Sequence, residues 1–225
     1  MIILWTKEDS EEVLNDLGSA FREKPHRFFN EPDLHSRLYN IVEEKLEQKG
    51  ELFAITKDGL TASLVHHEYP TPFRCDMRDK GFSIVGEPDR IQKRSLHKRE
   101  HYDLVVLNPD FIKKFDAIVV AGKNYKRFCE EKEKIEVSPV QWACEIRFAA
   151  FVENNLPVDW KENVFQDVEK IIASLNYKVG KADFAANGSV MVFIGIKPDC
   201  GIKQLEKQLH QFGLGRNFPI KVQTA

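Results

Sequence analysis

Apolar residues recur at intervals of three and four positions in several parts of the chain, which is the period of a helix with one buried face. The helices that this spacing predicts span 8–22, 25–50, 160–176 and 200–213. The second of them carries its own end signals, because Asn30 or Glu31 can cap its start and Pro32 suits its first turn. Gly50 then ends this helix.

Other segments have the composition of β-strands. The strands that we expect span 61–73, 101–110, 115–122, 141–150 and 189–196, and 124–137 is a charged, helix-capable connection. From residue 30 onward the expected order is helix, three strands, helix, strand and helix. Antiparallel strands followed by a helical crossover give a mixed sheet flanked by helices, so we expect an α/β fold.

The strand expected at "QWACEIRFAA" (141–150) carries two opposite charges in its middle. Side chains alternate across a strand, so Glu145 and Arg147 share one face and the apolar residues around them share the other. Burying a carboxylate and a guanidinium costs several kcal/mol per ion unless each finds partners. The two residues can pair with each other as a structural feature, or they can serve chemistry together with other charged residues.

Two further acids occupy positions where an apolar residue is expected. Glu31 falls on the centre line of its helix's apolar stripe, one turn before Leu34, so its carboxylate points towards the core side of the helix end. Asp103 shares one face of its strand with Val105 and Leu107. The structural alternatives are favourable charge at a helix N-terminus, worth about 0.3–1 kcal/mol, and the tolerance of edge strands for charge.

A helix glutamate, a strand aspartate and a strand acid-x-base, in that order, resemble the PD-(D/E)XK nuclease superfamily. The segments that carry the resemblance are "NEPDLHSRLY" (30–39), "LVHHEYPT" (64–71), "HYDLVVLNP" (101–109) and "CEIRF" (144–148). The resemblance covers roughly residues 25–200. It implies a restriction-endonuclease-like αβββαβ core, in one domain over 1–225 with its core at about 25–213 and a helical extension at 1–24.

The function that the resemblance implies is a metal-dependent nuclease, a hydrolase that cleaves phosphodiester bonds in DNA. Mg²⁺ or Mn²⁺ would neutralise charge on the phosphate and activate the attacking water. The resemblance makes Asp103 and Glu145 the expected metal ligands, and gives Glu31 a second ion or the orientation of the water. Arg147 is the fourth expected catalytic residue and would contact the scissile phosphate. Because members of this superfamily are often dimeric, a homodimer is a further expectation.

Arg147 stands where the superfamily pattern has lysine. A lysine can deprotonate a water because its pKa falls on burial, whereas arginine stays protonated and cannot act as a general base. Arg147 can still stabilise negative charge on a phosphoryl transition state, and a lysine such as Lys123 or Lys126 is an alternative source of a base. Two other interpretations stay open: a catalytically impaired relative that binds nucleic acid or a protein partner without cleavage, and an unrelated α/β domain whose charged strand residues satisfy each other.

The charge balance of the chain bears on its partners. The 225 residues carry a net charge of −2 at pH 7, whereas dedicated nucleic-acid binders usually have a stronger positive balance. Basic residues nevertheless concentrate in "RIQKRSLHKREH" (90–101), which fits either a solvated loop or a loop that contacts phosphates. The residues expected to bind nucleic acid there are Arg90, Lys93, Arg94, Lys98 and Arg99.

The remaining composition indicates a cytoplasmic protein with no membrane contact. No run approaches the ~20 apolar residues that a membrane span needs. The start, "MIILWTKEDSEEV", turns acidic after five residues and has no basic lead, unlike a signal peptide. The 4 cysteines are far apart and form no CxxC pair, which argues against a zinc ribbon and a disulfide framework.

Overall fold

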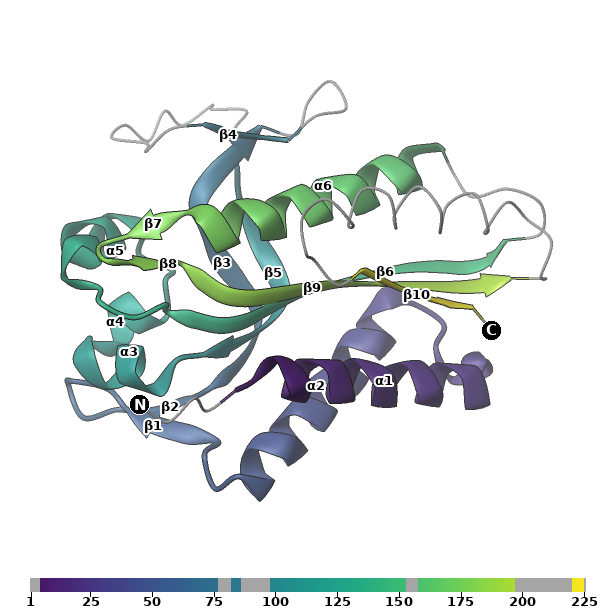
Figure 1. Ribbon diagram of the computed structural model, residues 1–225, viewed down its shortest axis with the longest axis horizontal. Coiled ribbons are helices and arrows are strands. Elements are labelled where there is room, and N and C mark those ends of the chain that lie inside the picture. The colour runs from purple at the N-terminus through teal and green to yellow at the C-terminus, as the bar shows by residue number, and fades with distance from the viewer. Residues whose placement is uncertain (1–4, 77–81, 86–97, 153–157, 197–219, 225) are drawn as a thin grey trace.

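A six-stranded mixed sheet forms the centre of the computed structural model, which describes residues 5–76, 82–85, 98–152, 158–196 and 220–224 (Figure 1). The strand order is β10-β9-β6-β5-β3-β4. The strands are β3 (Val65–Asp76), β4 (Ser83–Val85), β5 (Lys98–Leu107), β6 (Val140–Val152), β9 (Ala185–Ile196) and β10 (Ile220–Thr224). Neighbours pair antiparallel from β4 to β6, whereas β6, β9 and β10 run parallel. The expected α/β fold with a mixed sheet flanked by helices is confirmed at this level.

Helices cover both faces of the sheet. Helices α1 (Lys7–Glu23) and α2 (Glu31–Gln48) lie on one side, and α6 (Val158–Asn176) lies on the other (Figure 1). Helix α6 connects β6 to β9, which supplies the crossover that parallel neighbours require. The order α2, β3, β5, β6, α6, β9 therefore contains the helix, three strands, helix and strand that the sequence predicts.

The alternation of side chains along β6 matches these layers. Trp142 stacks on Trp5, which lies just before α1, with ring centroids 5.6 Å apart. Phe148 packs edge-on against Phe21 of α1, at 6.1 Å. Glu145 has the opposite parity and contacts α6. The apolar face of β6 therefore lies towards α1, and its charged face lies towards α6.

Capping explains where α1 and α2 begin. The Thr6 and Asn30 side chains accept hydrogen bonds from the backbone of Asp9 and Asp33, and the two aspartates accept hydrogen bonds from the backbones of their capping residues in return. Asp9 also binds Lys45 of α2 and Lys49 at the C-cap of α2, which ties the two helices together. The expected helices at 8–22 and 160–176 are confirmed, and within 25–50 the helix covers Glu31–Gln48, after the 3₁₀ turn Pro25–Arg27.

Small elements surround the large sheet. Two hairpins and three short helices occupy the remaining described segments, together with one-turn 3₁₀ helices at Pro25–Arg27 and Lys132–Lys134. They are β1 (Phe53–Ile55) with β2 (Thr61–Ser63), β7 (Lys178–Val179) with β8 (Ala182–Asp183), α3 (Pro109–Lys114), α4 (Ala117–Val120) and α5 (Tyr125–Glu131). Neither hairpin is predicted from the sequence.

The strand predicted at 115–122 is wrong, because α4 occupies this segment. Periodicity cannot distinguish a short buried strand from a short helix. In the structure, Val119 and Val120 are buried while Ile118 is 51% exposed, which a single helical turn achieves. The amide of Ala117 donates to the Asp58 carboxylate at 3.0 Å, so a residue distant in sequence satisfies the start of the turn.

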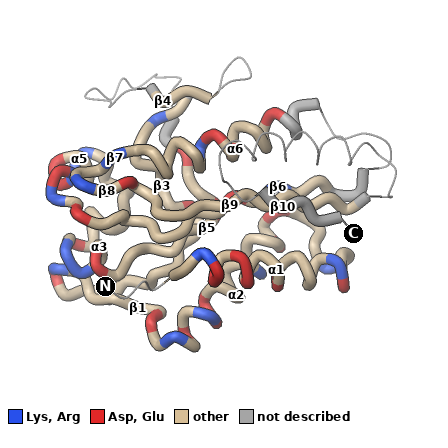
Figure 2. The backbone as a smooth tube through the Cα atoms, viewed as in Figure 1, with Lys and Arg blue, Asp and Glu red and all other residues tan. Residues whose placement is uncertain are grey.

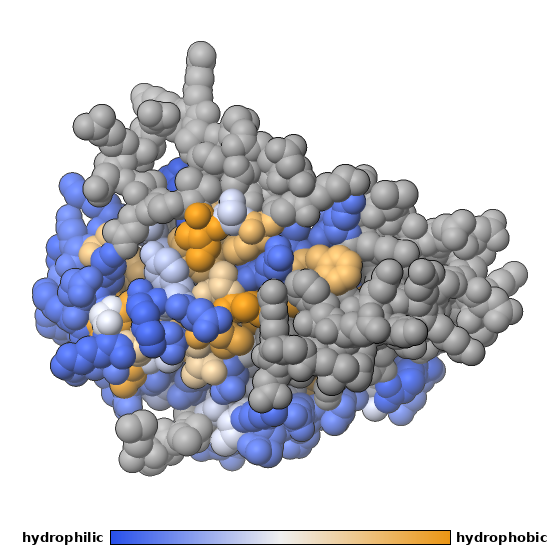
Figure 3. Space-filling model, turned by 45° about the horizontal axis from the view of Figure 1, so that its top comes forward, coloured by the Kyte–Doolittle hydropathy of each residue, from blue (hydrophilic) through white to orange (hydrophobic). Residues whose placement is uncertain are grey.

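Polar and apolar surface are unevenly distributed. Figure 2 shows Lys, Arg, Asp and Glu on the helices and at the end of the molecule formed by α3, α5, β7 and β8, whereas β9 carries none. In the space-filling view, a group of hydrophobic side chains interrupts the hydrophilic surface in the middle of the face shown (Figure 3).

Among the helices that the structure describes, none combines the length and apolar character required to cross a lipid bilayer. The helix predicted at 200–213 lies outside the described residues.

Candidate functional site

Strands β5 and β6 part in the middle of the sheet. They pair from Leu107 to Leu104 on β5, and the last partner on β6 is Cys144. Backbone amides two residues apart along a strand point to the same side, so the amides of Ile146 and Phe148 face the gap that follows. Unpaired backbone donors inside a sheet are costly, and these two require other acceptors.

Two of the predicted acids supply those acceptors. The amide of Ile146 donates to Asp103 Oδ2 at 2.6 Å, and the amide of Phe148 donates to Glu31 Oε2 at 3.2 Å. Glu31 is the first residue of α2 and Asp103 belongs to β5, so the two acids reach neighbouring positions of β6 from different elements. The structure thus brings Glu31 and Asp103 together beside the strand that carries the other two predicted residues.

The environment of the two carboxylates shifts their pKa values in opposite directions. Burial raises the pKa of Glu31 above its ordinary value, although the Arg147 guanidinium opposes the shift. For Asp103, burial would raise the pKa, but the contact with His35 and the hydrogen bond from Ile146 outweigh it and lower the pKa. Their side chains remain 30% and 17% exposed, so solvent reaches both groups.

Glu145 is buried and pairs with a lysine of α6. Lys170 Nζ lies 2.8 Å from Glu145 Oε1, and each side chain is at most 5% exposed. Burial raises the pKa of Glu145 well above its ordinary value, against the opposing effect of the ammonium. Burial would lower the pKa of Lys170, but the charges of Glu145 and Asp167 more than compensate and raise it.

Arg147 also finds its main partner on α6. Its Nε and Nη2 atoms both donate to the Asp167 carboxylate, the latter at 3.0 Å, which is a bidentate pair. Its Nη1 atom lies 3.8 Å from Glu31 Oε1, and the side chain is 29% exposed. Glu145 and Arg147 therefore do not pair with each other; each pairs with a residue of α6.

The α6 partners form a polar stripe beside the apolar stripe from which the helix is predicted. Asp167, Lys170 and Ser174 are all buried, at helix positions i, i+3 and i+7 beside the apolar stripe. The Ser174 hydroxyl bonds the Tyr102 hydroxyl, and Lys170 Nζ donates to the His101 carbonyl at 2.9 Å. Three polar residues in one row next to an apolar stripe are the sequence signal that would have found them.

A second group of potential ligands surrounds Asp103. One ligand atom from each of His35, Glu68 and Asp103 lies within 4.8 Å of the other two, and this is the metal-compatible group of three found among the described residues. Neither Glu31 nor Glu145 belongs to it. His35 is four positions after Glu31 on α2, so the two share a helix face, whereas Glu68 on β3 has no comparable sequence signal.

The basic segment is described only in part. Arg90, Lys93 and Arg94 lie outside the described residues. Lys98 and Arg99 begin β5, where their backbones pair with Cys75 and Arg74 of β3. The expected contact of this segment with nucleic acid therefore stays a prediction.

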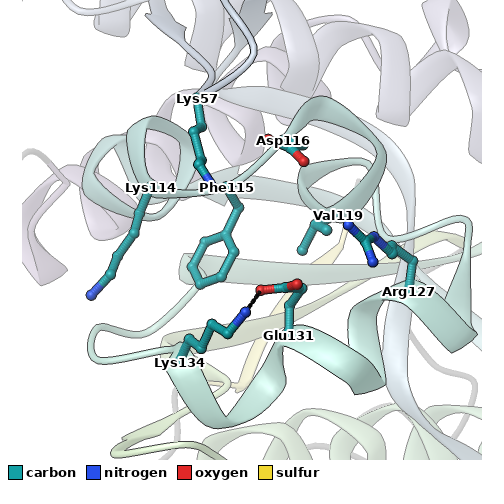
Figure 4. A pocket seen from close by; sticks show the side chains of 8 residues that line it. All are labelled: Lys57, Lys114, Phe115, Asp116, Val119, Arg127, Glu131 and Lys134. Carbon is teal, nitrogen blue, oxygen red and sulfur yellow. Dashed lines mark hydrogen bonds and ion pairs between the residues drawn. The ribbon is translucent and has the colours of Figure 1, made fainter.

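A pocket of about 250 Å³ lies apart from the acids, among α3, α4, α5 and the turn after β1 (Figure 4). Its lining residues are Lys57, Lys114, Phe115, Asp116, Val119, Arg127, Glu131 and Lys134. Three of its four cations are paired, because Lys134, Lys114 and Arg127 contact Glu131, Glu136 and Glu130. Most of its positive charge is thus compensated locally.

No family model matches the chain, and neither a curated protein nor a solved structure matches it. What the site can do chemically therefore follows from its own residues.

Proposed function

We propose that this protein is a metal-dependent nuclease of the PD-(D/E)XK type that hydrolyses phosphodiester bonds in DNA. One observation carries the proposal. The carboxylates of Asp103 and Glu31 accept hydrogen bonds from two amides on the same side of β6, those of Ile146 and Phe148, beyond the point where β5 stops pairing with β6. Glu145 and Arg147 lie on the same short stretch of β6. The order of elements and the mixed sheet support the resemblance that the sequence motifs suggest.

The donor set fits a hard divalent cation. Mg²⁺ and Mn²⁺ prefer carboxylate oxygens and water, and bind through one or two carboxylates together with phosphate oxygens. Asp103 would be the principal ligand, because its lowered pKa keeps it ionised and solvent reaches it. Glu31 would hold the second position, whereas Glu145 would need to leave Lys170 to bind the ion directly. The metal supplies charge neutralisation at the phosphate and an activated water.

The cations of the cluster have positioning and electrostatic roles. Asp167 fixes the Arg147 guanidinium by two hydrogen bonds and leaves Nη1 on the side of Glu31, where it would contact a phosphate oxygen. Arginine cannot accept a proton from water, so Arg147 is no general base. Lys170 stays protonated beside Glu145 and Asp167, so it also contributes charge rather than base catalysis.

Other parts of the proposal rest on the sequence alone. The segment at 90–101 would grip the phosphate backbone immediately before β5. DNA as the substrate and a homodimer as the assembly come from the resemblance. A cytoplasmic location likewise stays a prediction.

The test is cleavage of linear and supercoiled DNA in Mg²⁺ or Mn²⁺ by the wild type and by Asp103→Asn, Glu31→Gln and Glu145→Gln. In Asp103→Asn and Glu31→Gln the amide side chain keeps an oxygen that can accept from the β6 backbone, so the fold is preserved while charge is lost, whereas Glu145→Gln also removes the charged partner of Lys170. We expect Asp103→Asn and Glu145→Gln each to lower the rate by about 10²-fold or more. Glu133→Gln, at an exposed acid of the 3₁₀ turn, is the matched control. DNA cleavage by Asp103→Asn and by Glu145→Gln at the rate of the wild type would rule out the proposed site.

A second candidate is a non-cleaving relative that binds nucleic acid. The observation that favours it is the occupation of both strand charges by α6, Glu145 by Lys170 and Arg147 by Asp167. Arg147→Lys separates the two candidates. If this variant gains cleavage, the natural protein is catalytically impaired; if it loses cleavage, Arg147 belongs to a working site. Fluorescence anisotropy with labelled DNA measures binding in either case.

A further inference from the structure

The residues around Asp103 form a possible cation site that includes an imidazole, unlike the pair of carboxylates Glu31 and Asp103. We propose that His35, Glu68 and Asp103 together bind a divalent transition-metal ion through one imidazole nitrogen and two carboxylate oxygens. The three residues come from α2, β3 and β5, and one ligand atom of each lies within 4.8 Å of the others. The use of this ion in cleavage rests on the proposed function, whereas the site itself does not.

The distance between two of the ligand atoms matches that around a bound ion. His35 Nε2 lies 3.5 Å from Asp103 Oδ2, which is too long for a good hydrogen bond. Two ligands bound at 2.0–2.2 Å in tetrahedral geometry are about 3.4 Å apart. The two atoms therefore stand at the separation that a shared metal requires.

His35 Nε2 has no better partner in the fold. The atom is buried, and it makes no hydrogen bond of normal geometry with any described residue. A buried ring nitrogen whose nearest partner is a carboxylate oxygen at 3.5 Å is poorly satisfied, and coordination to a metal would remove that cost. On Asp103, the Oδ2 atom that faces His35 Nε2 also accepts from the Ile146 amide, and a carboxylate oxygen has a further lone pair for an ion.

The surroundings hold the ligands in place and leave the site reachable. The Ile146 amide fixes the Asp103 carboxylate, and the His67 ring lies between Tyr39 and the Asp103 carbonyl, with Nδ1 at 3.2 Å from that oxygen. Ordered partners behind the ligands are the usual support of a metal site. Glu68 is exposed, so an ion can enter from solvent.

The donor set predicts which ions bind. Imidazole nitrogen favours transition metals over Mg²⁺ and Ca²⁺, which prefer oxygen ligands alone. Mn²⁺ accepts both kinds of ligand and is visible to electron paramagnetic resonance, so it is the probe of choice. We expect one tightly bound Mn²⁺ per chain, with an affinity at least about 10-fold higher than that of Mg²⁺.

The experiment is titration of the full chain with MnCl₂ and, separately, MgCl₂, by calorimetry and by electron paramagnetic resonance. His35→Gln and Glu68→Gln should each lower Mn²⁺ affinity about 10- to 100-fold. Pulsed resonance should detect ¹⁴N coupling from a ligated imidazole in the wild type and not in His35→Gln. His26→Gln is the matched control, because it removes an exposed imidazole of the Pro25–Arg27 turn, outside the ligand group and its supporting residues; its Mn²⁺ affinity and nitrogen coupling should match the wild type.

The outcomes separate this inference from the proposed function. Mn²⁺ binding with nitrogen coupling in a protein that cuts no DNA supports the site and removes the nuclease. Cleavage that requires Asp103 but is accompanied by Mn²⁺ binding unaffected by His35→Gln and Glu68→Gln overturns the inference and keeps the nuclease. Absence of Mn²⁺ binding, or nitrogen coupling that persists in His35→Gln, also overturns it.

Discussion

Lys170 Nζ of α6 lies 2.8 Å from Glu145 Oε1 on β6, with both side chains buried between the helix and the sheet. The pair gives the charged residue of a core strand a partner, and Arg147 has its own in Asp167. A buried pair of this kind is costly to break but not necessarily a net stabiliser, because both ions lose their hydration.

Removing one member of this pair should destabilise the fold strongly. We expect Lys170→Met to lower the free energy of unfolding by about 3–5 kcal/mol, since it leaves a buried carboxylate without its cation. The double variant Glu145→Leu with Lys170→Met should recover most of that loss. Urea unfolding followed by circular dichroism measures both. Lys134→Met breaks the exposed pair with Glu131 and should change stability by less than about 0.5 kcal/mol. A double variant as unstable as the sum of its singles would contradict the coupling.

The turn of the β7–β8 hairpin should not tolerate a side chain at Gly180. Its φ is +55°, and an added Cβ would lie 2.3 Å from the Ile135 carbonyl oxygen. We expect Gly180→Ala to cost about 3 kcal/mol or more, by overlap and by backbone strain together. Gly59→Ala is the control, with φ +84° but no atom within 4 Å of its Cβ, and should cost about 1–2 kcal/mol. Thermal denaturation compares the two, and equal losses would show that the contact with Ile135 is unimportant.

The contribution of Asp9 should depend on pH. Burial would raise its pKa, but the hydrogen bond from Lys49 and the capping of Thr6 outweigh this and lower it. A carboxyl with a lowered pKa in the folded state stabilises the protein above its ordinary pKa of about 3.9 and loses that effect as the pH falls through the folded value. Asp9→Asn should therefore cost about 1–2 kcal/mol at pH 7 and less at pH 2, because the effect is lost as the pH falls through the folded pKa.

Guanidinium unfolding of both proteins across this pH range tests the Asp9 prediction. Asp16→Asn makes the same charge change at an exposed position of the same helix, and should alter stability by less than about 0.5 kcal/mol at either pH. A loss in Asp9→Asn that is equal at pH 7 and pH 2 would mean that ionisation of Asp9 plays no part.

On the proposed function, Phe29 should contribute to DNA binding. Its side chain is 71% exposed and stands two residues before Glu31, at the start of α2. Exposed aromatic rings beside a nucleic-acid site stack on unpaired bases, for about 1–3 kcal/mol each. Phe29→Ala should weaken binding of single-stranded DNA by about 5- to 100-fold in an anisotropy titration. Phe53→Ala removes a ring of similar exposure from β1 and should leave the affinity unchanged.

The parts of the fold with strong local signals could be predicted. Asn30, Pro32 and the apolar stripe of α2 specify a helix by themselves, and the structure places its first residue at Glu31. The strand prediction at 115–122 failed because the helical turn there has a distant partner, Asp58, which accepts from the Ala117 amide across the fold. The β7–β8 hairpin at Gly180 was not predicted either, because its strands are only two residues long and its turn packs on Ile135, which is distant in sequence.

The candidate site divides in the same way. Glu31 and Asp103 were recognisable because each replaces an apolar residue in a clear pattern, and the structure brings both to β6. Whether they act together with Glu145 and Arg147 in catalysis stays a prediction. Glu68 has no such signal, since only the path of β3 brings it near Asp103. Lys170 lies in a helix whose apolar stripe alone was used for the prediction.

The parting of β5 and β6 gives the centre of the sheet an unusual sensitivity. In an ordinary sheet the acceptors are main-chain carbonyls, which are neutral. Here the amides of Ile146 and Phe148 donate to carboxylates instead, and carboxylates also bind protons and cations. Whatever competes for the Glu31 and Asp103 oxygens also competes with the backbone of Ile146 and Phe148. Cation binding by Glu31 and Asp103 is therefore coupled to the hydrogen bonds that these carboxylates accept from β6. The structural difference between the cation-bound and the cation-free protein should lie at the centre of the sheet, between β5 and β6, rather than at its edge strands.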